Sequence, residues 1–254
     1  DPFRAVQYGT FKIFSDGSLG SRSAKLFEPY SDDPTTDGML VISQEDLNER
    51  MLKGYEMGLQ PAIHCIGDKG LDVVLNAIEY TLEKSREHGM TEREQADRLP
   101  FRIIHAQMAN PELIDRMTKL PVVLDIQPSF FLTDMHWIKD RVGEKRASMS
   151  YLWKTYQNRG LLLTGGSDCP VEMFSPWNGI YSLVTRKDLE GWPEGGVQPE
   201  EKLSVYDAVC VFSKNIPYAN GEQDLMGTLE EGKFADMIVL DRNIFEIPED
   251  EIKD

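Results

Sequence analysis

Residues 61–66 read PAIHCI, and residues 71–87 shortly after them read LDVVLNAIEYTLEKSRE. The first stretch is a short, continuous apolar run, which is typical of a strand buried on both faces of a parallel sheet. The second stretch has the apolar spacing of a helix. A buried strand followed by a helix is the repeating unit of parallel α/β folds, so this pair predicts one such unit.

Four other apolar runs extend this pattern along the chain, and they too are expected to be strands buried on both faces. These runs occupy residues 11–14, 101–104, 122–126 and 161–163. Helical spacing is found at residues 43–57, 111–119, 148–159 and 204–214. Ser43 begins a capping-box pattern, and Asn110 before Pro111 is a typical helix start. The alternation predicts a parallel α/β sheet or barrel, whereas residues 237–240 are expected to form a strand of a different, smaller unit.

Composition excludes several classes of protein. The 254 residues include 43 acidic and 27 basic side chains, and the net charge of −16 has the wrong sign for binding nucleic acid or an anionic membrane surface. No apolar stretch approaches the roughly 20 residues of a membrane span. Three widely spaced cysteines argue against a disulfide framework, so we expect a cytoplasmic protein.

Residues able to bind a metal or move a proton lie at or near the ends of several predicted strands. His64 and His105 close two of them, and Asp168 follows the last. In parallel α/β folds the catalytic groups gather at the carboxyl ends of the strands. A single histidine in such a place is more often a hydrogen-bonded core residue, but two of only four histidines at equivalent positions favour metal ligands.

Lys12 and Asp168 each allow two interpretations. A lysine between apolar residues of a buried strand is expected to lose its proton, because desolvation disfavours the ammonium. Lys12 would then be a neutral amine able to form a Schiff base or a carbamate, or else its side chain would reach to the strand end. Asp168 follows Gly165 and Gly166, and is interpreted as a general base or a helix N-cap.

The remaining candidates are weaker. His88 lies in a polar helix end and is expected to be solvated, whereas His136 could touch a substrate from its loop. Trp137, Trp177 and the Phe130-Phe131 pair could form an apolar pocket or simply pack the loops.

Four motifs in this order resemble the amidohydrolase-3 branch of the metal-dependent amidohydrolase superfamily, which includes YtcJ-like proteins and N-substituted formamide deformylases. The motifs are KIFSDGSLGSRSA at 12–24, HCIGD at 64–68, IHAQ at 104–107 and GSDCP at 166–170. The resemblance also takes in QPS at 127–129, DRVGEKRA at 140–147 and GTLEEGKFAD at 227–236. The separate motifs are weak evidence, but their combination and order are specific.

The resemblance implies a (β/α)₈ TIM-type barrel joined to a small β-sandwich. Residues 1–225 would supply about the last five βα units of the barrel, and residues 226–254 part of the sandwich. The family's carboxylated, metal-bridging lysine falls on Lys12, its two later histidine ligands on His64 and His105, and its aspartate on Asp168. The implied cofactor is a divalent metal, expected to be zinc, as one or two ions.

The implied activity is hydrolysis of a non-peptide carbon–nitrogen bond, of the amide or formamide type, in a small-molecule substrate. Asp168 would hold the attacking water and carry its proton to the leaving nitrogen. A carbamate on Lys12 would be an anionic oxygen ligand, and it forms only on an uncharged amine. Related branches of the superfamily cleave phosphoesters or lactones, so these bonds are the alternative within the same fold.

One family feature is absent from the sequence. The family contributes a His-x-His pair from its first strand, and these 254 residues contain no such pair. The chain is therefore expected to be the C-terminal portion of a longer enzyme. An open five-stranded sheet has exposed edges, so association into a homo-oligomer or completion by another segment is expected. The competing hypothesis is a catalytically inactive fragment, without metal, that serves as an association or ligand-binding module.

Overall fold

A five-stranded, fully parallel sheet forms the centre of the fold, as the apolar runs predict. The computed structural model describes residues 9–254. Neighbouring strands pair in the order in which they occur along the chain. The strands are β1 (Thr10–Phe14), β2 (Gln60–Cys65), β3 (Phe101–His105), β4 (Val122–Ile126) and β5 (Leu162–Gly165). All five predicted strands are confirmed to within a residue or two at each end.

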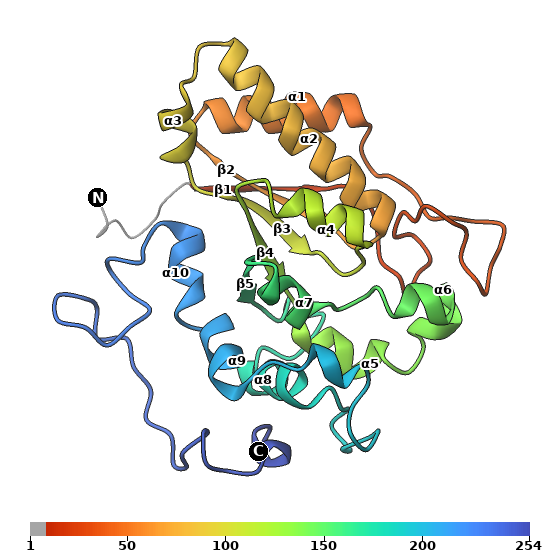
Figure 1. The fold of residues 1–254 in the computed structure, drawn as a ribbon, viewed down its shortest axis with the longest axis vertical. Helices are drawn as coiled ribbons and strands as arrows, with labels where there is room; N and C mark the ends of the chain where they lie inside the picture. The colour runs from red at the N-terminus through yellow and green to blue at the C-terminus, as the bar shows by residue number, and fades with distance from the viewer. Residues whose placement is uncertain (1–8) are drawn as a thin grey trace.

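Helices connect the strands and continue beyond the last one. They are α1 (Gln44–Glu56), α2 (Asp68–Glu87), α3 (Glu92–Ala96), α4 (Pro111–Met117), α5 (Phe131–Asp134), α6 (Ile138–Ala147), α7 (Trp153–Asn158), α8 (Pro176–Thr185), α9 (Val205–Val211) and α10 (Asn215–Asn220). Crossovers between parallel strands are almost always right-handed, so strands in sequential order carry their crossover helices on one face. Figure 1 shows α1, α2 and α4 together on one side of the sheet. This winding is that of a barrel and confirms the partial-barrel prediction.

The register explains why one face of the sheet forms the core. One row across the five strands consists of Ile13, Ile63, Ile103, Leu124 and Leu163. All five side chains are at most 9% exposed. These positions lie on the same face of neighbouring strands, and the strands therefore carry apolar residues there.

The opposite face of β1 is open, which corrects the expectation that each strand is buried on both faces. Lys12 is exposed, and Phe14, two residues along on the same face, is 52% exposed. Within residues 9–254, β1 is an edge strand and pairs only with β2. The desolvation that the sequence suggested for Lys12 is therefore absent, because its face lacks a neighbour on one side.

Helix starts follow the sequence closely, but one predicted helix is shorter. The Ser43 and Asn110 side chains accept hydrogen bonds from the backbone N–H groups of Asp46 and Leu113, which begins α1 and α4 as expected. The helix expected over residues 148–159 begins only at Trp153 as α7. Tyr151 has a φ of +55°, and this left-handed conformation cannot belong to a right-handed helix.

The segment after α10 contains no strand in the described residues, so the predicted strand at residues 237–240 is wrong. A strand needs a paired neighbour, and none lies beside this segment within residues 9–254; Val239 is 95% exposed. In Figure 1 this segment runs as an extended loop away from the sheet. A boundary between two domains near residue 225 stays a prediction. None of the helices among the described residues combines the length and apolar character needed to cross a bilayer.

Candidate metal centre at the carboxyl edge of the sheet

Two histidines meet at the edge where the parallel strands end. His64 is the last residue but one of β2, and His105 is the last residue of β3. Their ring centroids lie 4.5 Å apart in an edge-to-face arrangement. Both side chains are buried, at 8% and 5% exposure. The structure thus brings together the two histidines that the sequence singled out.

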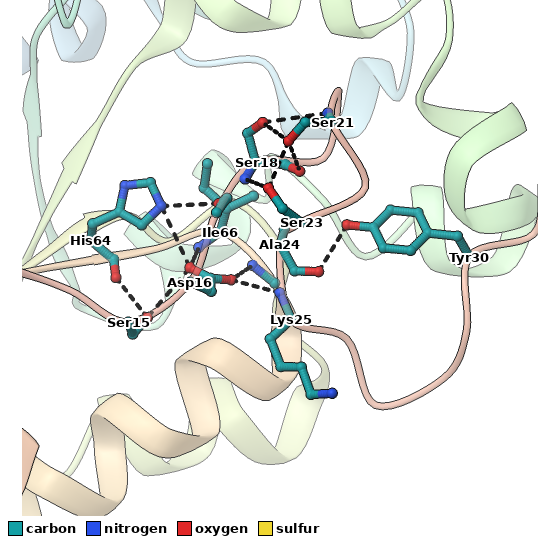
Figure 2. Close-up of polar contacts among 12 residues, drawn as sticks. Ser15, Asp16, Ser18, Ser21, Ser23, Ala24, Lys25, Tyr30, His64 and Ile66 are labelled. Atoms are coloured by element: carbon teal, nitrogen blue, oxygen red, sulfur yellow. Dashed lines mark hydrogen bonds and ion pairs between the residues drawn. The ribbon is translucent and has the colours of Figure 1, made fainter. Parts of the chain in front are cut away.

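A hydrogen bond to a backbone carbonyl sets the orientation of His64. Its Nε2 lies 3.0 Å from the carbonyl oxygen of Gly17 and 3.5 Å from Oδ1 of Asp16. A carbonyl oxygen can only accept, so Nε2 carries the hydrogen and Nδ1 carries a lone pair. No hydrogen bond engages Nδ1 within the described part of the chain. Figure 2 shows the imidazole of His64 directed at Asp16 and the neighbouring backbone.

His105 is a buried imidazole whose ring nitrogens make no hydrogen bond of ordinary geometry among the described residues, although the Gln127 side chain lies close enough to act on it. Burial, then the charges of His64 and Lys12, lower the pKa of His105 to about 3, and only the nearby Gln127 side chain opposes the shift. The backbone of His105 is also left-handed, with a φ of +73°. A neutral imidazole with both nitrogens free is costly inside a protein unless something else binds it.

The charge of Lys12 acts on both histidines, and the charge of Asp168 acts on His64. Lys12 Nζ lies 4.8 Å from the ring centroid of Phe14, which in turn lies 5.0 Å from that of His64. Burial lowers the pKa of His64; the Gly17 hydrogen bond opposes the shift, Lys12 adds to it, and the negative charge of Asp168 opposes it. Asp168 is exposed, with a φ of +55°. The next helix, α8, begins only at Pro176 after Ser175, so the N-cap interpretation of Asp168 is wrong.

Asp16 is a buried residue of this edge that the sequence analysis missed. Its carboxylate accepts hydrogen bonds from the backbone N–H groups of Lys25, Ile66 and Gly67 at 2.9, 3.1 and 2.9 Å (Figure 2). Burial raises the pKa of Asp16 to about 6, against the effect of these bonds. Asp16 thereby ties the loop after β1 to the loop after β2. Its place two residues beyond a strand, just before Gly17, is the signal that could have identified it.

The donor chemistry of the histidine pair fits a divalent metal ion. Neutral imidazole is the commonest metal ligand, and a ligating histidine usually donates its other N–H to a carbonyl or carboxylate, as His64 does here. Both ring nitrogens of His105 lack a hydrogen-bond partner among the described residues, and a bound ion would supply a partner for one of them. No three His, Cys, Asp or Glu side chains in residues 9–254 are grouped to hold an ion together. The histidine pair therefore has two candidate donor residues, without a third such side chain grouped beside them in the described residues.

The other histidines have structural partners. His88 Nδ1 lies 2.7 Å from Glu56 on an exposed surface, in agreement with the prediction of a solvated side chain. His136 Nε2 lies 3.1 Å from Asp188, and its ring stacks on Trp192 with centroids 5.2 Å apart. The recorded contacts of His136 are thus with the loop after α8, and substrate contact stays a prediction.

The aromatic residues proposed for an apolar pocket do not gather in one place. The ring of Phe130 lies 5.7 Å from that of His105 and flanks the histidine pair. Trp137 instead lies beside Gly20 and Arg141. Trp177 lines a shallow pocket formed with residues of the C-terminal segment. Of these proposed pocket residues, only Phe130 has a ring contact with the histidine pair in the described part of the chain.

Residues 3–254 match the amidohydrolase family. The chain is 38% identical over 242 residues to YtcJ of Bacillus subtilis (strain 168), covering 95% of this chain and 44% of that protein. It is 25% identical over 236 residues to the N-substituted formamide deformylase of Arthrobacter pascens, covering 92% of this chain and 41% of that one. The crystal structure of an uncharacterized metal-dependent hydrolase from Pyrococcus horikoshii OT3 superposes with a TM-score of 0.80 at 34% identity, covering 96% of this chain and 46% of that one. The chain thus spans less than half the length of each of these proteins.

Proposed function

This chain belongs to the amidohydrolase family, and on that premise we propose that the intact protein is a metal-dependent hydrolase of non-peptide carbon–nitrogen bonds. The observation that carries the proposal is the buried pair of His64 and His105, with ring centroids 4.5 Å apart and both nitrogens of His105 without a hydrogen bond. His105 therefore adds little to stability, since its polar nitrogens are desolvated without partners. The two histidines have a clear use as a pair of metal ligands.

Four side chains take roles in this centre. His64 and His105 would hold the ion through neutral nitrogens, and a carbamate on Lys12 would add an anionic oxygen. Asp168 would be a further ligand as well as the catalytic acid and base. We propose that the ion is zinc, bound as one or two ions. When bound, such a divalent ion lowers the pKa of a water molecule bound to it and polarises the substrate carbonyl. The carbamate on Lys12 is proposed from the family resemblance and not from burial, since the side chain is exposed.

Asp168 would carry out the proton transfer of the reaction. As water attacks the substrate carbonyl carbon, the Asp168 carboxylate accepts a proton from that water. The carbon–nitrogen bond then breaks, and the same proton passes to the leaving nitrogen, so the products are a carboxylic acid and an amine. The left-handed backbone places this carboxylate on an exposed turn after β5, where a substrate can reach it.

The choice of a carbon–nitrogen bond rests on relatives. The family name and the formamide deformylase of Arthrobacter pascens both support an amide or formamide substrate. Hydrolysis of a phosphoester or lactone is the second candidate, because the same ion and proton carrier serve those bonds as well. A catalytically inactive association or ligand-binding module is the third, and a protein that binds no metal would favour it.

Further properties of the intact protein are proposed on chemical grounds. A small molecule is the expected substrate, and the charge of −16 disfavours nucleic acid and anionic membranes as partners. The free cysteines agree with a reducing compartment, for which the cytoplasm is our proposal. Association of this chain into a homo-oligomer, or its completion by another segment, would cover the open edges of its sheet.

A hydrolysis panel on the intact protein tests the proposal. N-substituted formamides and simple amides are compared with phosphoesters and lactones, with and without a chelator, for the wild type and Asp168→Asn. We expect metal-dependent release of amine, abolished by Asp168→Asn. Turnover confined to phosphoesters or lactones would assign the second candidate. No turnover of any class by a protein that also binds no metal would leave the binding module.

A further inference from the structure

The turn that presents His105 has an unusual backbone. His105 and Ala106 are consecutive non-glycine residues with φ values of +73° and +45°. Bulky residues seldom adopt this region, and strained turns of this kind persist only where the surroundings hold them. Contacts of residues 105–107 with their surroundings must therefore hold this conformation.

A buried hydrogen-bond network grips the next residue, Gln107. The Nε2 of Gln107 donates to the hydroxyl of Tyr151 at 2.6 Å and to Oδ2 of Asp134 at 3.0 Å. The Tyr151 hydroxyl donates to the same Asp134 oxygen. The backbone N–H of Tyr151 also donates to the carbonyl of Gln107 at 2.9 Å. Gln107 is thus held through both its side chain and its backbone.

The residues on either side of Gln107 are fixed as well. The hydroxyl of the buried Tyr156 donates to the carbonyl of Ala106 at 2.9 Å. The N–H of Met108 donates to the carbonyl of Ile66 at 3.1 Å, which joins the turn to the end of β2, close to His64. The turn after β3 therefore has little freedom to relax into an ordinary conformation.

The backbone of Tyr151 is held in turn by Arg186. Its carbonyl accepts a hydrogen bond from Nη1 of Arg186 at 2.9 Å. The Arg186 guanidinium is fully buried, 3.9 Å above the ring centroid of Phe131 and 4.7 Å from that of Trp153. Tyr151 also adopts a left-handed φ of +55°. Buried polar contacts therefore fix both the backbone and the side chain of Tyr151.

We propose that Tyr151 and Asp134 are positioning residues that act through Gln107 to hold the imidazole of His105 in place for the metal. This inference rests on the proposed function, because it takes His105 as a ligand. Neither Tyr151 nor Asp134 touches the imidazole, and their effect passes through the backbone of residues 105–107. Partners that orient a metal ligand typically change metal affinity by about 10-fold to 100-fold when they are lost.

The test compares three variants of the intact protein by zinc titration against a chelating dye. Tyr151→Phe removes only the hydroxyl of the network. Asp134→Asn keeps a carbonyl oxygen that accepts from Tyr151 and Gln107. Tyr181→Phe is the matched control, because it also removes a buried tyrosine hydroxyl that donates a hydrogen bond. The Tyr181 hydroxyl donates to the backbone carbonyl of Asp188 at 2.8 Å, and no contact with residues 105–107 is found among the described residues.

We expect Tyr151→Phe to weaken zinc binding about 10-fold, with Asp134→Asn and Tyr181→Phe within about threefold of wild type. Amide hydrogen exchange of the metal-free protein should accelerate at Met108 and residue 151 in Tyr151→Phe alone. If Tyr151→Phe does not fold, Gln107→Met carries the same test, because it removes only the side-chain amide.

Three results would overturn the account, and they are distinguishable. Wild-type zinc affinity in a folded Tyr151→Phe or Gln107→Met would refute the positioning role and leave the proposed function standing. A wild-type protein that binds no zinc would refute the proposed function and, with it, the role assigned to the network. An equal loss of affinity in Tyr181→Phe would show a general loss of stability and also refute positioning.

Discussion

His105 is the residue whose surroundings are hardest to explain by stability alone. Its imidazole is 5% exposed and has no hydrogen bond on either nitrogen. We predict that His105→Leu leaves the unfolding free energy of the metal-free protein within about 1 kcal/mol of wild type, since removing an unpaired buried polar group is nearly neutral. The same variant should lose metal affinity. Urea unfolding in chelator and a zinc titration measure the two effects.

A second variant separates the effect of losing the imidazole from the effect of backbone strain. His105→Asn suits the positive φ better than leucine does, because asparagine adopts the left-handed region more readily. A loss of more than about 2 kcal/mol in both variants would mean that the imidazole stabilises the metal-free fold. That result would contradict the ligand assignment.

Lys12 tests the same centre from an exposed position. We predict that Lys12→Ala abolishes turnover while the unfolding free energy stays within about 0.5 kcal/mol, because the side chain is exposed. Bicarbonate should raise metal occupancy in the wild type and not in Lys12→Ala. Lys53→Ala, at an exposed site in the last turn of α1, is the control for losing a lysine. Near-normal hydrolysis by Lys12→Ala would refute the assignment.

Sequence reasoning located the histidine pair but misjudged other residues, for identifiable reasons. His64 and His105 could be found because strand ends in a parallel sheet share an edge. The exposure of Lys12 depends on which strands lie beside β1, and the sequence of β1 does not contain this information. The role of Asp16 depends on the backbone N–H groups of Ile66 and Gly67, about fifty residues away in the chain.

At the scale of elements, Asp16 joins the loops that follow β1 and β2. We predict that Asp16→Ala lowers the unfolding free energy by at least about 2 kcal/mol, because three backbone N–H groups, two of them buried, lose their acceptor. Thermal or urea unfolding measures the loss. Asp33→Ala, whose carboxylate only caps an exposed turn at Thr35, should change little. Equal, small losses in both variants would show that Asp16 does not join the loops.

Asp134 links the segments after β3 and β4, and the pKa of its carboxyl group predicts the direction in which stability changes with pH. Burial raises the pKa of Asp134 from 3.8 to about 6, against the hydrogen bonds from Tyr151 and Gln107. The folded protein therefore holds this proton more tightly than the unfolded chain, so the stability that protonation contributes is lost as pH rises through about 6. From about pH 7 to pH 4, wild type should gain about 2 kcal/mol relative to Asp134→Asn.

Unfolding of both proteins across this pH range measures the difference. Using the difference cancels the other groups, including His105, whose lowered pKa acts in the opposite direction as the pH falls. A difference that does not vary with pH would show that Asp134 titrates normally.

Elements with an internal signal were predicted correctly, and elements that depend on distant partners were not. The β2 run and the α2 spacing contain their own periodicity, and Asn110 marks the start of α4. Residues 237–240 have the composition of a strand but lack a pairing partner among the described residues. The helix at α7 begins late because Tyr151 is held in a left-handed conformation by Gln107 and Arg186, and local sequence does not reveal those contacts.

At the scale of the whole molecule, sequential parallel strands explain how a metal centre can form from distant parts of the chain. Each strand ends at the same edge, so residues 64 and 105 become neighbours although 41 positions apart in the numbering. The chain spans less than half the length of its relatives. The remaining ligands of a complete centre would therefore come from elsewhere in the intact protein or from a partner.

Elemental analysis of the purified intact protein tests the central claim most directly. The protein is dialysed against zinc and bicarbonate, freed of excess metal, and compared with the double variant His64→Ala/His105→Leu, with circular dichroism confirming that both are folded. We predict at least one divalent ion per wild-type chain and its loss in the double variant. A metal-free wild type, or a folded double variant that keeps its full metal content, would contradict the claim that these two histidines hold the ion.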